Sequence, residues 1–288
     1  MGRIVSIMLI IGLIAASAVS FAQSLDGSSY TPGKDADIDM YLSSWKESMP
    51  RHTHGSLVER DILTRGDPMN PPSRGAVLVY INHFSYATLD AHASTAPTAL
   101  EGQQEVFYIN SGKGIIKAGG KTADLRKDIA ILMPAGLEFT MTNTGDEPLT
   151  MYLINEPIPD GFRPNKDMLV KDEKATPISG TRGHWCHIVK GLFSTNDGLG
   201  TLESVITVSF DPMTIGHPHS HGEGCEEVWT EMKGASIAFI GKQIRCQPPG
   251  TGYMIPADGK TPHSNINISG EQTKMLYFAR YREHEVRP

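Results

Sequence analysis

The amino-acid sequence predicts an all-β protein made of two tandem antiparallel barrels of the jelly-roll, double-sheet kind, preceded by a short amino-terminal helix. From about Pro71 onward, short runs rich in Val, Ile, Tyr, Phe and Thr are interrupted by Gly, Pro, Asn and Asp. No long helical pattern lies between these runs. An internal repeat then divides the β-rich part into two similar halves. Closed antiparallel barrels produce this rhythm of strands and turns.

Length and composition agree with a globular protein of two domains. The chain has 288 residues, with 39% hydrophobic and 20% charged residues, which is enough apolar material for a substantial core. The formal net charge is −6 and the basic residues form no stripe. Nucleic acid is therefore not an expected partner.

Residues 1–22 read as a secretory signal peptide. Arg3 precedes an apolar run over residues 4–14, and Ser20-Phe21-Ala22 forms a small-x-small cleavage site before Gln23. The run is short for a membrane span of about 20 residues. No Cys stands at the cleavage site to carry a lipid. We therefore expect a periplasmic or secreted protein without a stable membrane anchor.

Residues 23–70 are predicted to form an amino-terminal extension that contains one helix. Aspartates at its start suit the helix dipole, and Pro50 ends it. The apolar residues at helical spacing are Ile38, Tyr41, Leu42, Trp45 and Met49. His52 and His54 form a His-x-His pair, but no carboxylate follows at a useful spacing. We interpret both as surface residues.

The remaining chain divides into a first barrel over residues 71–160, a polar linker over 161–180 and a second barrel over 181–288. Its β-like runs are Ala76–Phe84, Glu105–Ile109, Leu149–Ile154, Leu202–Phe210, Ser236–Ile240 and Lys274–Tyr281. The two halves share a spaced pattern. The residues Glu105, Gly112, Pro134, Asn143 and Met151 correspond to Glu227, Gly234, Pro256, Asn267 and Met275. The distance from Glu to Pro is equal in both copies, as is the distance from Asn to Met.

The stretch Gly216-His217-Pro218-His219-Ser220-His221 is the strongest chemical signal. Histidines at alternate positions of a strand point to one face. Glu226 and Glu227 follow, and His263 lies further downstream. Imidazole and carboxylate donors together suit a divalent Mn, Fe, Ni, Cu or Zn ion. A metal site is therefore predicted in the second half.

These residues resemble the two sequence motifs of the cupin superfamily. The first motif is matched by Gly216, His219, His221, Glu227 and Gly234, and the second by Pro256, Gly259, His263 and Asn267. Two details depart from the pattern: five residues separate His221 from Glu227, and the Pro256–Gly259 segment is one residue longer than usual. The resemblance implies a bicupin whose metal ligands are His219, His221, Glu227 and His263.

Two positions in this ligand set have alternatives. Glu226 would restore the usual spacing to His221, but Glu227 is the repeat counterpart of Glu105. Strand alternation sends neighbouring side chains to opposite faces, so only one of these two glutamates should ligate. His217 could replace one of the other histidines if the register slips by two, or could serve as a donor behind the ligands.

The repeat predicts that only the second barrel binds metal. Counting along the first copy puts Pro97, Ala99 and Phe139 where the second has His219, His221 and His263. These side chains cannot ligate a metal. We therefore expect one divalent ion per chain and a metal-free first barrel.

Three cysteines allow at most one intramolecular disulfide, and Cys225 with Cys246 is the candidate pair. Cys225 also lies two residues before Glu227, which would place a thiol near the metal.

The ligand set favours an enzyme that acts without O2 on a small oxygen-rich metabolite such as a sugar acid, as a lyase, isomerase, hydrolase or decarboxylase. Its catalytic residues are unknown; the candidates are Glu226, His217, Tyr277 and Arg280. A metal-dependent dioxygenase is the alternative, and a non-catalytic cupin that binds a small molecule or carbohydrate is the second alternative. A small molecule is the expected partner, and a homo-oligomer remains open.

Overall fold

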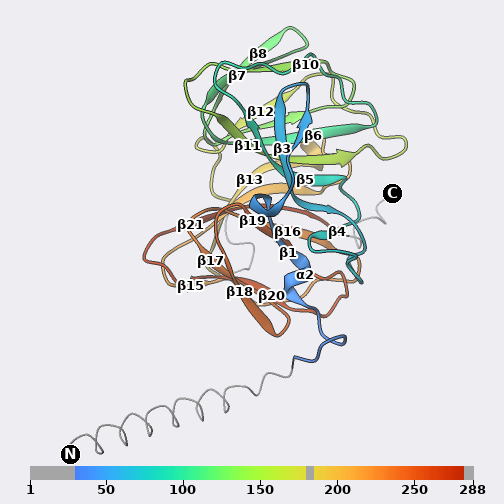
Figure 1. Ribbon diagram of the computed structural model, residues 1–288, viewed down its shortest axis with the longest axis vertical. Coiled ribbons are helices and arrows are strands. Elements are labelled where there is room, and N and C mark those ends of the chain that lie inside the picture. The colour runs from blue at the N-terminus through green and yellow to red at the C-terminus, as the bar shows by residue number, and fades with distance from the viewer. Residues whose placement is uncertain (1–29, 180–184, 282–288) are drawn as a thin grey trace, which may run out of the picture.

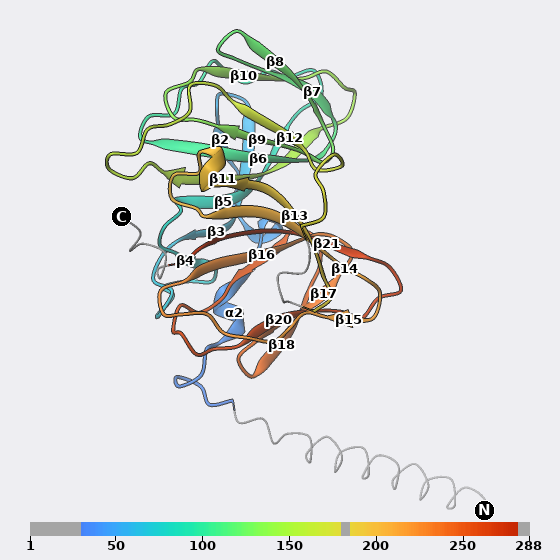
Figure 2. The same ribbon diagram turned by 180° about the vertical axis from the view of Figure 1, so that it is seen from behind.

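The computed structural model describes residues 30–179 and 185–281. The predicted signal peptide lies outside these residues. The described chain is nearly all β and folds into two barrels stacked one on the other (Figures 1 and 2). In the ranges 30–179 and 185–281, no helix has the length and hydrophobicity needed to span a membrane.

Barrel 1 consists of an eight-stranded and a three-stranded sheet. The large sheet has the order β12-β9-β6-β11-β5-β3-β2, with β4 paired to β3, and the small sheet has the order β10-β7-β8. The strands are β2 (Arg51–Thr53), β3 (Leu57–Arg65), β4 (Ala76–Leu78), β5 (His83–Leu89), β6 (Gln103–Ser111), β7 (Lys113–Ala118), β8 (Lys121–Arg126), β9 (Ile129–Met133), β10 (Phe139–Asn143), β11 (Leu149–Pro157) and β12 (Leu169–Asp172). Residues such as Phe107, Met151 and Leu153 fill the interior between them.

Barrel 2 consists of a six-stranded sheet, β1-β19-β16-β21-β14-β13, and a four-stranded sheet, β15-β20-β17-β18. The strands are β1 (Leu42–Ser44), β13 (His187–Ser194), β14 (Ser204–Phe210), β15 (Thr214–Ile215), β16 (Glu226–Lys233), β17 (Ser236–Ile240), β18 (Gln243–Gln247), β19 (Thr251–Met254), β20 (His263–Asn267) and β21 (Thr273–Arg280). Short 3-10 turns, η1 (Trp45–Glu47) and η2 (Thr195–Asp197), complete the elements together with helix α2 (Ile38–Tyr41).

The large sheets of the two barrels pack face to face. Phe84 on β5 meets Phe278 on β21 edge-on, with ring centroids 5.0 Å apart. The hydrophobic cluster around this contact includes outward-facing residues of both sheets, among them Tyr152 and Val228. Burial of this shared apolar surface joins the barrels into one body.

The predicted helix over residues 38–49 is wrong beyond its first turn. Helix α2 covers only Ile38–Tyr41. The next residues form β1, because the backbone of Leu42–Ser44 pairs with Thr251–Tyr253 of β19. Tertiary pairing therefore overrides the apolar spacing, and Met49, which was assigned to the apolar stripe, is 84% exposed.

Two other segments differ from the predicted pattern. The run Ala76–Phe84 is not one strand: β4 ends at Leu78, and the N–H groups of Val79 and Tyr80 instead donate to the carboxylate of Glu226. The segment predicted as linker, 161–180, contains β12, which pairs with β9 at the edge of barrel 1. The extension 23–70 is also built into the barrels, through β1, β2 and β3.

The repeated residues occupy matching positions in the two barrels. The side-chain amide of Asn143 donates to the carbonyls of Leu89, Asp90 and Glu147 at 2.9–3.0 Å. Asn267 makes the same three contacts in barrel 2, with Phe210, Asp211 and Glu271, at 2.7–3.1 Å. Gly112 and Gly234 both adopt positive φ, at 91° and 89°. At each position a segment from later in the same barrel passes too close for a Cβ atom.

Candidate metal centre

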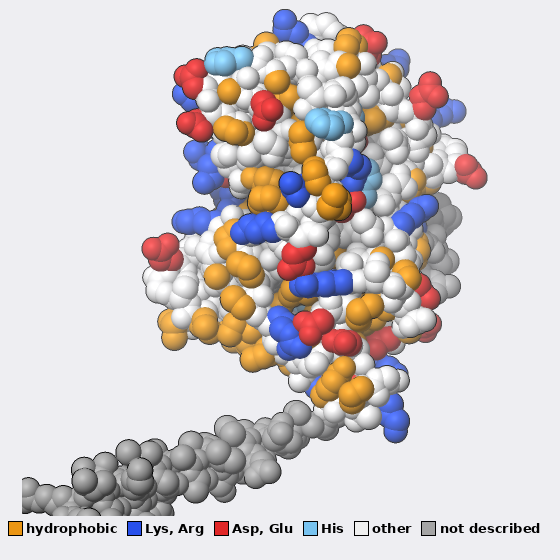
Figure 3. Space-filling view, viewed as in Figure 1, with side chains coloured by type: hydrophobic (Ala, Val, Ile, Leu, Met, Phe, Trp, Pro, Cys, Tyr) orange, Lys and Arg blue, Asp and Glu red, His pale blue; other side chains and the backbone are white. Residues whose placement is uncertain are grey.

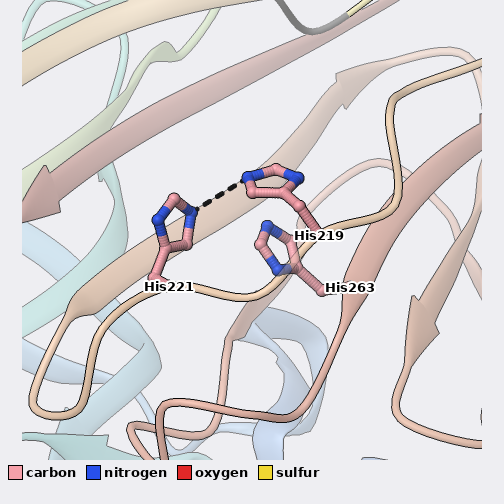
Figure 4. Close-up of side chains that lie close together, drawn as sticks. All are labelled: His219, His221 and His263. Carbon is pink, nitrogen blue, oxygen red and sulfur yellow. Dashed lines mark hydrogen bonds between the residues drawn. The ribbon is translucent and has the colours of Figure 1, made fainter.

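Three segments of barrel 2 bring the predicted ligands together, and Figure 4 shows the three histidines among them. Glu227 lies on β16, His263 begins β20, and His219 and His221 lie in the loop before β16. The backbones of His219 and His263 exchange two hydrogen bonds of 3.3 and 2.9 Å, which fixes the loop against β20. The prediction of a continuous strand over the histidines is wrong, since only His219 forms a bridge there.

The imidazoles and the carboxylate converge through their end atoms. Nε2 of His221 lies 2.7 Å from Oε2 of Glu227, and Nε2 of His263 lies 2.8 Å from Oε1. Nε2 of His219 is 3.1 Å from Nε2 of His221. Ligand atoms of His219, His221 and His263 all lie within 4.8 Å of one another. A second group within the same limit joins His221, Glu227 and Cys225.

These separations fit neighbouring donors of one ion. Two donors at right angles, each about 2.1 Å from an ion, are about 3.0 Å apart. His263 supports the same reading, because the residue is 1% exposed and neither ring nitrogen has a hydrogen-bond partner among the described residues. Its Nε2 is close to Glu227 without the direction of a hydrogen bond. Side-by-side donors aimed at a common point produce this arrangement.

His219 is held in the form that a metal needs. Its Nδ1 lies 2.7 Å from the carbonyl of His217, so the ring donates from that side and its Nε2 lone pair is directed toward the cluster. Burial lowers the pKa of His219 to about 4, and the neighbouring His263 also lowers it. The imidazole is therefore neutral at pH 7. His217 itself packs edge-on against Trp185, with ring centroids 4.9 Å apart.

Glu227 is oriented by aromatic hydrogen-bond donors. The indole of Trp229 donates to Oε1 at 2.6 Å, and the hydroxyls of Tyr277 and Tyr281 donate to Oε2 at 2.9 and 3.0 Å. The directly opposite residue on β21 is Ala279, whose small side chain leaves room for the two tyrosines beside it. Three donors thus hold a carboxylate that is only 2% exposed.

The electrostatics of the cluster keep Glu227 ionised. Burial alone would raise its pKa, but the adjacent His263 and His221 hold the pKa well below the ordinary value of 4.5. Burial and the nearby Glu227 charge hold the pKa of Tyr277 well above 10, so the tyrosine remains a hydrogen-bond donor. An anionic oxygen ligand is therefore present at neutral pH.

The four candidate catalytic residues divide between the two faces of the sheet. Tyr277 contacts Glu227, and His217 supports His219. Glu226 points to the opposite face, where its carboxylate accepts the N–H groups of Val79 and Tyr80. Arg280 is the cross-strand neighbour of Glu226 and donates to the carbonyl of Thr201 at 2.7 Å. A role for Glu226 or Arg280 at the cluster does not fit this placement.

Sequence reasoning missed Tyr281 as a member of the site. The signal was present, because Tyr277, Ala279 and Tyr281 alternate along the predicted run Lys274–Tyr281 and would share a face of it. Cys225, which was expected near the metal, does lie beside His221 and Glu227. Cys246 is exposed on β18, and no disulfide joins the three cysteines, all of which are described.

In barrel 1, other side chains stand at the positions that correspond to the histidines of barrel 2. Phe139 stands at the position of His263, as predicted. Its backbone partner is Thr98, through two hydrogen bonds of 2.9 and 3.0 Å that match those between His263 and His219. Thr98, not Pro97, is therefore the counterpart of His219. The count along the sequence is displaced by one because barrel 1 has one residue fewer before its Glu.

Comparison with known proteins identifies the fold family. A family model described as a cupin domain matches residues 85–155, which lie in barrel 1. Residues 85–155 of this chain therefore contain a cupin domain. The match does not include the cluster, which lies in barrel 2. No curated protein matches the chain.

Solved structures with the same cupin fold cover most of the chain. A glyoxylate-induced protein from Pseudomonas aeruginosa aligns with TM-score 0.65 and 11% identity, over 87% of this chain and 91% of its own. Ylba from E. coli aligns with TM-score 0.63 and 14% identity, over 86% and 94%. An oxalate decarboxylase variant from Bacillus subtilis aligns with TM-score 0.62 and 13% identity, over 87% and 80%. At these identities the likeness concerns the fold.

Proposed function

We propose that this protein is a metal-dependent bicupin enzyme with one divalent ion per chain, held in barrel 2 by His219, His221, Glu227 and His263. The convergence of their donor atoms, at 2.7–3.1 Å between neighbours, is the observation that carries the proposal. The ring of the buried His263 supports it further, since neither nitrogen makes a hydrogen bond among the described residues and a buried polar atom without one is costly. The ion is Mn, Fe, Zn, Ni or Cu.

The reaction we propose proceeds without O2 on a small oxygen-rich metabolite such as a sugar acid. A divalent ion in this site would polarise a carbonyl or carboxylate oxygen or lower the pKa of a bound water. The protein side chains supply orientation: Trp229, Tyr277 and Tyr281 hold the carboxylate of Glu227, and His217 holds the ring of His219.

The reaction class is a lyase, isomerase, hydrolase or decarboxylase. An oxalate decarboxylase is among the proteins with this fold, and another is described as induced by glyoxylate. Both names concern small oxygen-rich acids, which supports that substrate class here. On the face seen in Figure 3, acidic and basic side chains are interspersed, in keeping with a small-molecule partner.

Metal analysis of purified protein tests the site. We expect about one ion per wild-type chain and a strong loss of metal in His263→Ala and Glu227→Gln. The matched control is Glu226→Gln, the adjacent carboxylate on the opposite face, which should retain the metal. Full retention after His263→Ala, or loss with Glu226→Gln and not with Glu227→Gln, would overturn the ligand assignment.

Turnover tests the reaction. The metal-loaded protein should convert a member of a panel of small hydroxy, keto and sugar acids under anaerobic conditions, and His263→Ala should not. Consumption of O2 in step with substrate would replace the proposal with a dioxygenase. Tight binding without conversion would indicate a binding protein instead.

We also propose that the protein is exported after removal of residues 1–22. The charge, apolar run and cleavage site of the signal sequence support this. Amino-terminal sequencing of protein recovered from the native compartment should begin at Gln23. An intact Met1 in the membrane fraction would contradict it.

A further inference from the structure

Barrel 1 retains a buried glutamate at the position that holds the metal ligand of barrel 2. Glu105 is 2% exposed, and its Oε1 accepts a 3.0 Å hydrogen bond from the side-chain amide of Asn155. Its Oε2 has no hydrogen-bond partner among the described residues. Phe139 and Thr98 stand in place of two of the histidines around it. A buried ionised carboxylate is stabilised by pairing with a cation.

The nearest cationic group is the imidazole of His54, which was predicted to lie on the surface. Its Nε2 is 3.3 Å from Oε2 of Glu105, and its side chain is only 6% exposed. The ring also packs on Phe139, with centroids 5.5 Å apart. His52, two residues earlier, is exposed as predicted.

The backbone is bent to bring His54 inside. His54 has φ of 46° and the following Gly55 has φ of 83°, in the left-handed region that few side chains adopt. The carbonyl of His54 accepts the N–H of Ala96 at 2.8 Å. This ties the turn between β2 and β3 to the segment that corresponds to the histidine loop of barrel 2. The strain is thus held in place by the neighbouring chain.

We propose that the imidazolium of His54 is the internal cation of barrel 1 and takes the place beside Glu105 that the metal ion takes beside Glu227. Barrel 1 would then bind a proton on an imidazole where barrel 2 binds a divalent ion. With the His54 side chain removed, the same place is a site for a free imidazole. The inference rests on the contacts in barrel 1 and holds whether or not barrel 2 is an enzyme.

The charged groups around His54 favour the protonated imidazolium form of its ring. Glu105 faces it from β6, and Glu59 on β3 contributes a second negative charge. Glu59 is itself paired with Arg51 at 2.7 Å and with His83 at 3.3 Å, which leaves Glu105 as the direct partner. Burial alone would lower the pKa of His54, but Glu105 and Glu59 raise it above the ordinary value of 6.5.

The raised pKa of His54 makes the stability of the folded protein depend on pH. A histidine whose pKa is raised by folding stabilises the folded state fully below its unfolded pKa, and this stability is lost as pH rises through the folded value. Replacing His54 by Asn, which tolerates the left-handed region, should therefore lower the unfolding midpoint by several degrees near pH 6 and by less near pH 9. The matched control, His52→Ala, should leave the midpoint unchanged.

Chemical rescue tests the occupancy directly. Imidazole added to the His54→Gly variant should raise its unfolding midpoint in a saturable way, and by more at pH 6 than at pH 9. It should not raise the midpoint of the wild type or of the double variant His54→Gly/Glu105→Gln. Failure of imidazole to raise the midpoint of a folded His54→Gly would overturn the proposal.

A titration of the wild-type ring keeps the proposal testable if these variants fail to fold. By NMR, the assigned His54 ring should titrate above its ordinary range, and Glu105→Gln should lower that pKa. An unchanged His54 pKa in Glu105→Gln, or a second metal ion bound in barrel 1 of the wild type, would refute the assignment.

Discussion

Barrels 1 and 2 keep the same framework and differ in what surrounds one buried glutamate. Both have a glutamate at the start of a central strand, a positive-φ glycine after it and an asparagine that binds three carbonyls. In barrel 2 the glutamate faces imidazoles on the loop and on β20. In barrel 1 it faces one imidazole from a turn outside the repeat. The framework residues serve folding, whereas the chemistry depends on side chains at the barrel end.

The family comparison illustrates the same division. The cupin-domain match lies in barrel 1, which lacks the predicted ligand set. Framework residues are sufficient for recognition of the fold, and they do not report whether a site is present. A residue-level comparison of the two barrels is needed to locate the chemistry.

The largest expected effect comes from giving barrel 2 the aromatic residue of barrel 1. His263→Phe reproduces Phe139 and removes a buried imidazole donor, so we expect metal affinity to fall by about 100-fold or more. Metal titration by calorimetry measures this. Retention of wild-type affinity would show that the two barrels do not differ at this position in the way we infer.

The two asparagines test the shared framework. Asn143→Ala and Asn267→Ala each leave three backbone carbonyls without their donor, so each should cost about 3 kcal/mol of unfolding free energy. Denaturant unfolding gives the values. Similar losses would confirm equivalent roles, whereas a loss confined to one variant would break the equivalence.

Tyr281→Phe sharpens the account of what orients Glu227. The change removes one donor from Oε2 and leaves Tyr277 in place, so metal affinity should fall by roughly 10-fold, as is typical of residues that orient ligands. Tyr86 lies on β5 of barrel 1, where its ring stacks on Trp45. Tyr86→Phe is the control and should leave metal affinity unchanged. An unaltered affinity in Tyr281→Phe would exclude the orienting role.

Two buried glutamates should make opposite contributions to the pH dependence of stability. The first is Glu59 in barrel 1. Burial would raise its pKa, but His83, Thr53 and Arg51 lower it to about 2. Its stabilising contribution is present above pH 4.5 and is lost as pH falls toward 2. The unfolding midpoint of Glu59→Gln should therefore lie below that of the wild type near pH 7 and approach it in acid. A gap that stays constant with pH would contradict this.

Glu231 inside barrel 2 should show the reverse effect. Burial raises its pKa to about 8. Folding then favours the protonated form, so stability falls as pH rises from about 4.5 to 8. The midpoint of Glu231→Gln relative to the wild type should rise over this interval and then level off. Thermal scans across the interval measure it, and a relative midpoint that falls with pH would refute the prediction.

Much of the fold could be predicted because strand composition and the repeat are local properties of the sequence. The two barrels and the equivalence of Asn143 and Asn267 follow from the spacing of the repeat. The grouping of His219, His221, Glu227 and His263 follows from the resemblance to the two cupin motifs. The extent of the first helix could not be predicted, because β1 forms only through pairing with β19, far along the chain.

Sequence alone determined the repeat and the types of candidate ligand, and it favoured Glu227 over Glu226, since these depend on residue identity and on a period of two. Only the tertiary structure decided that Glu226 fastens the segment at Val79, that Tyr281 reaches Glu227 and that His54 enters barrel 1 beside Glu105. Each of these contacts joins residues from different strands or from the two barrels. No local pattern encodes such contacts, because they arise when packing of the sheets brings distant segments to the same barrel end.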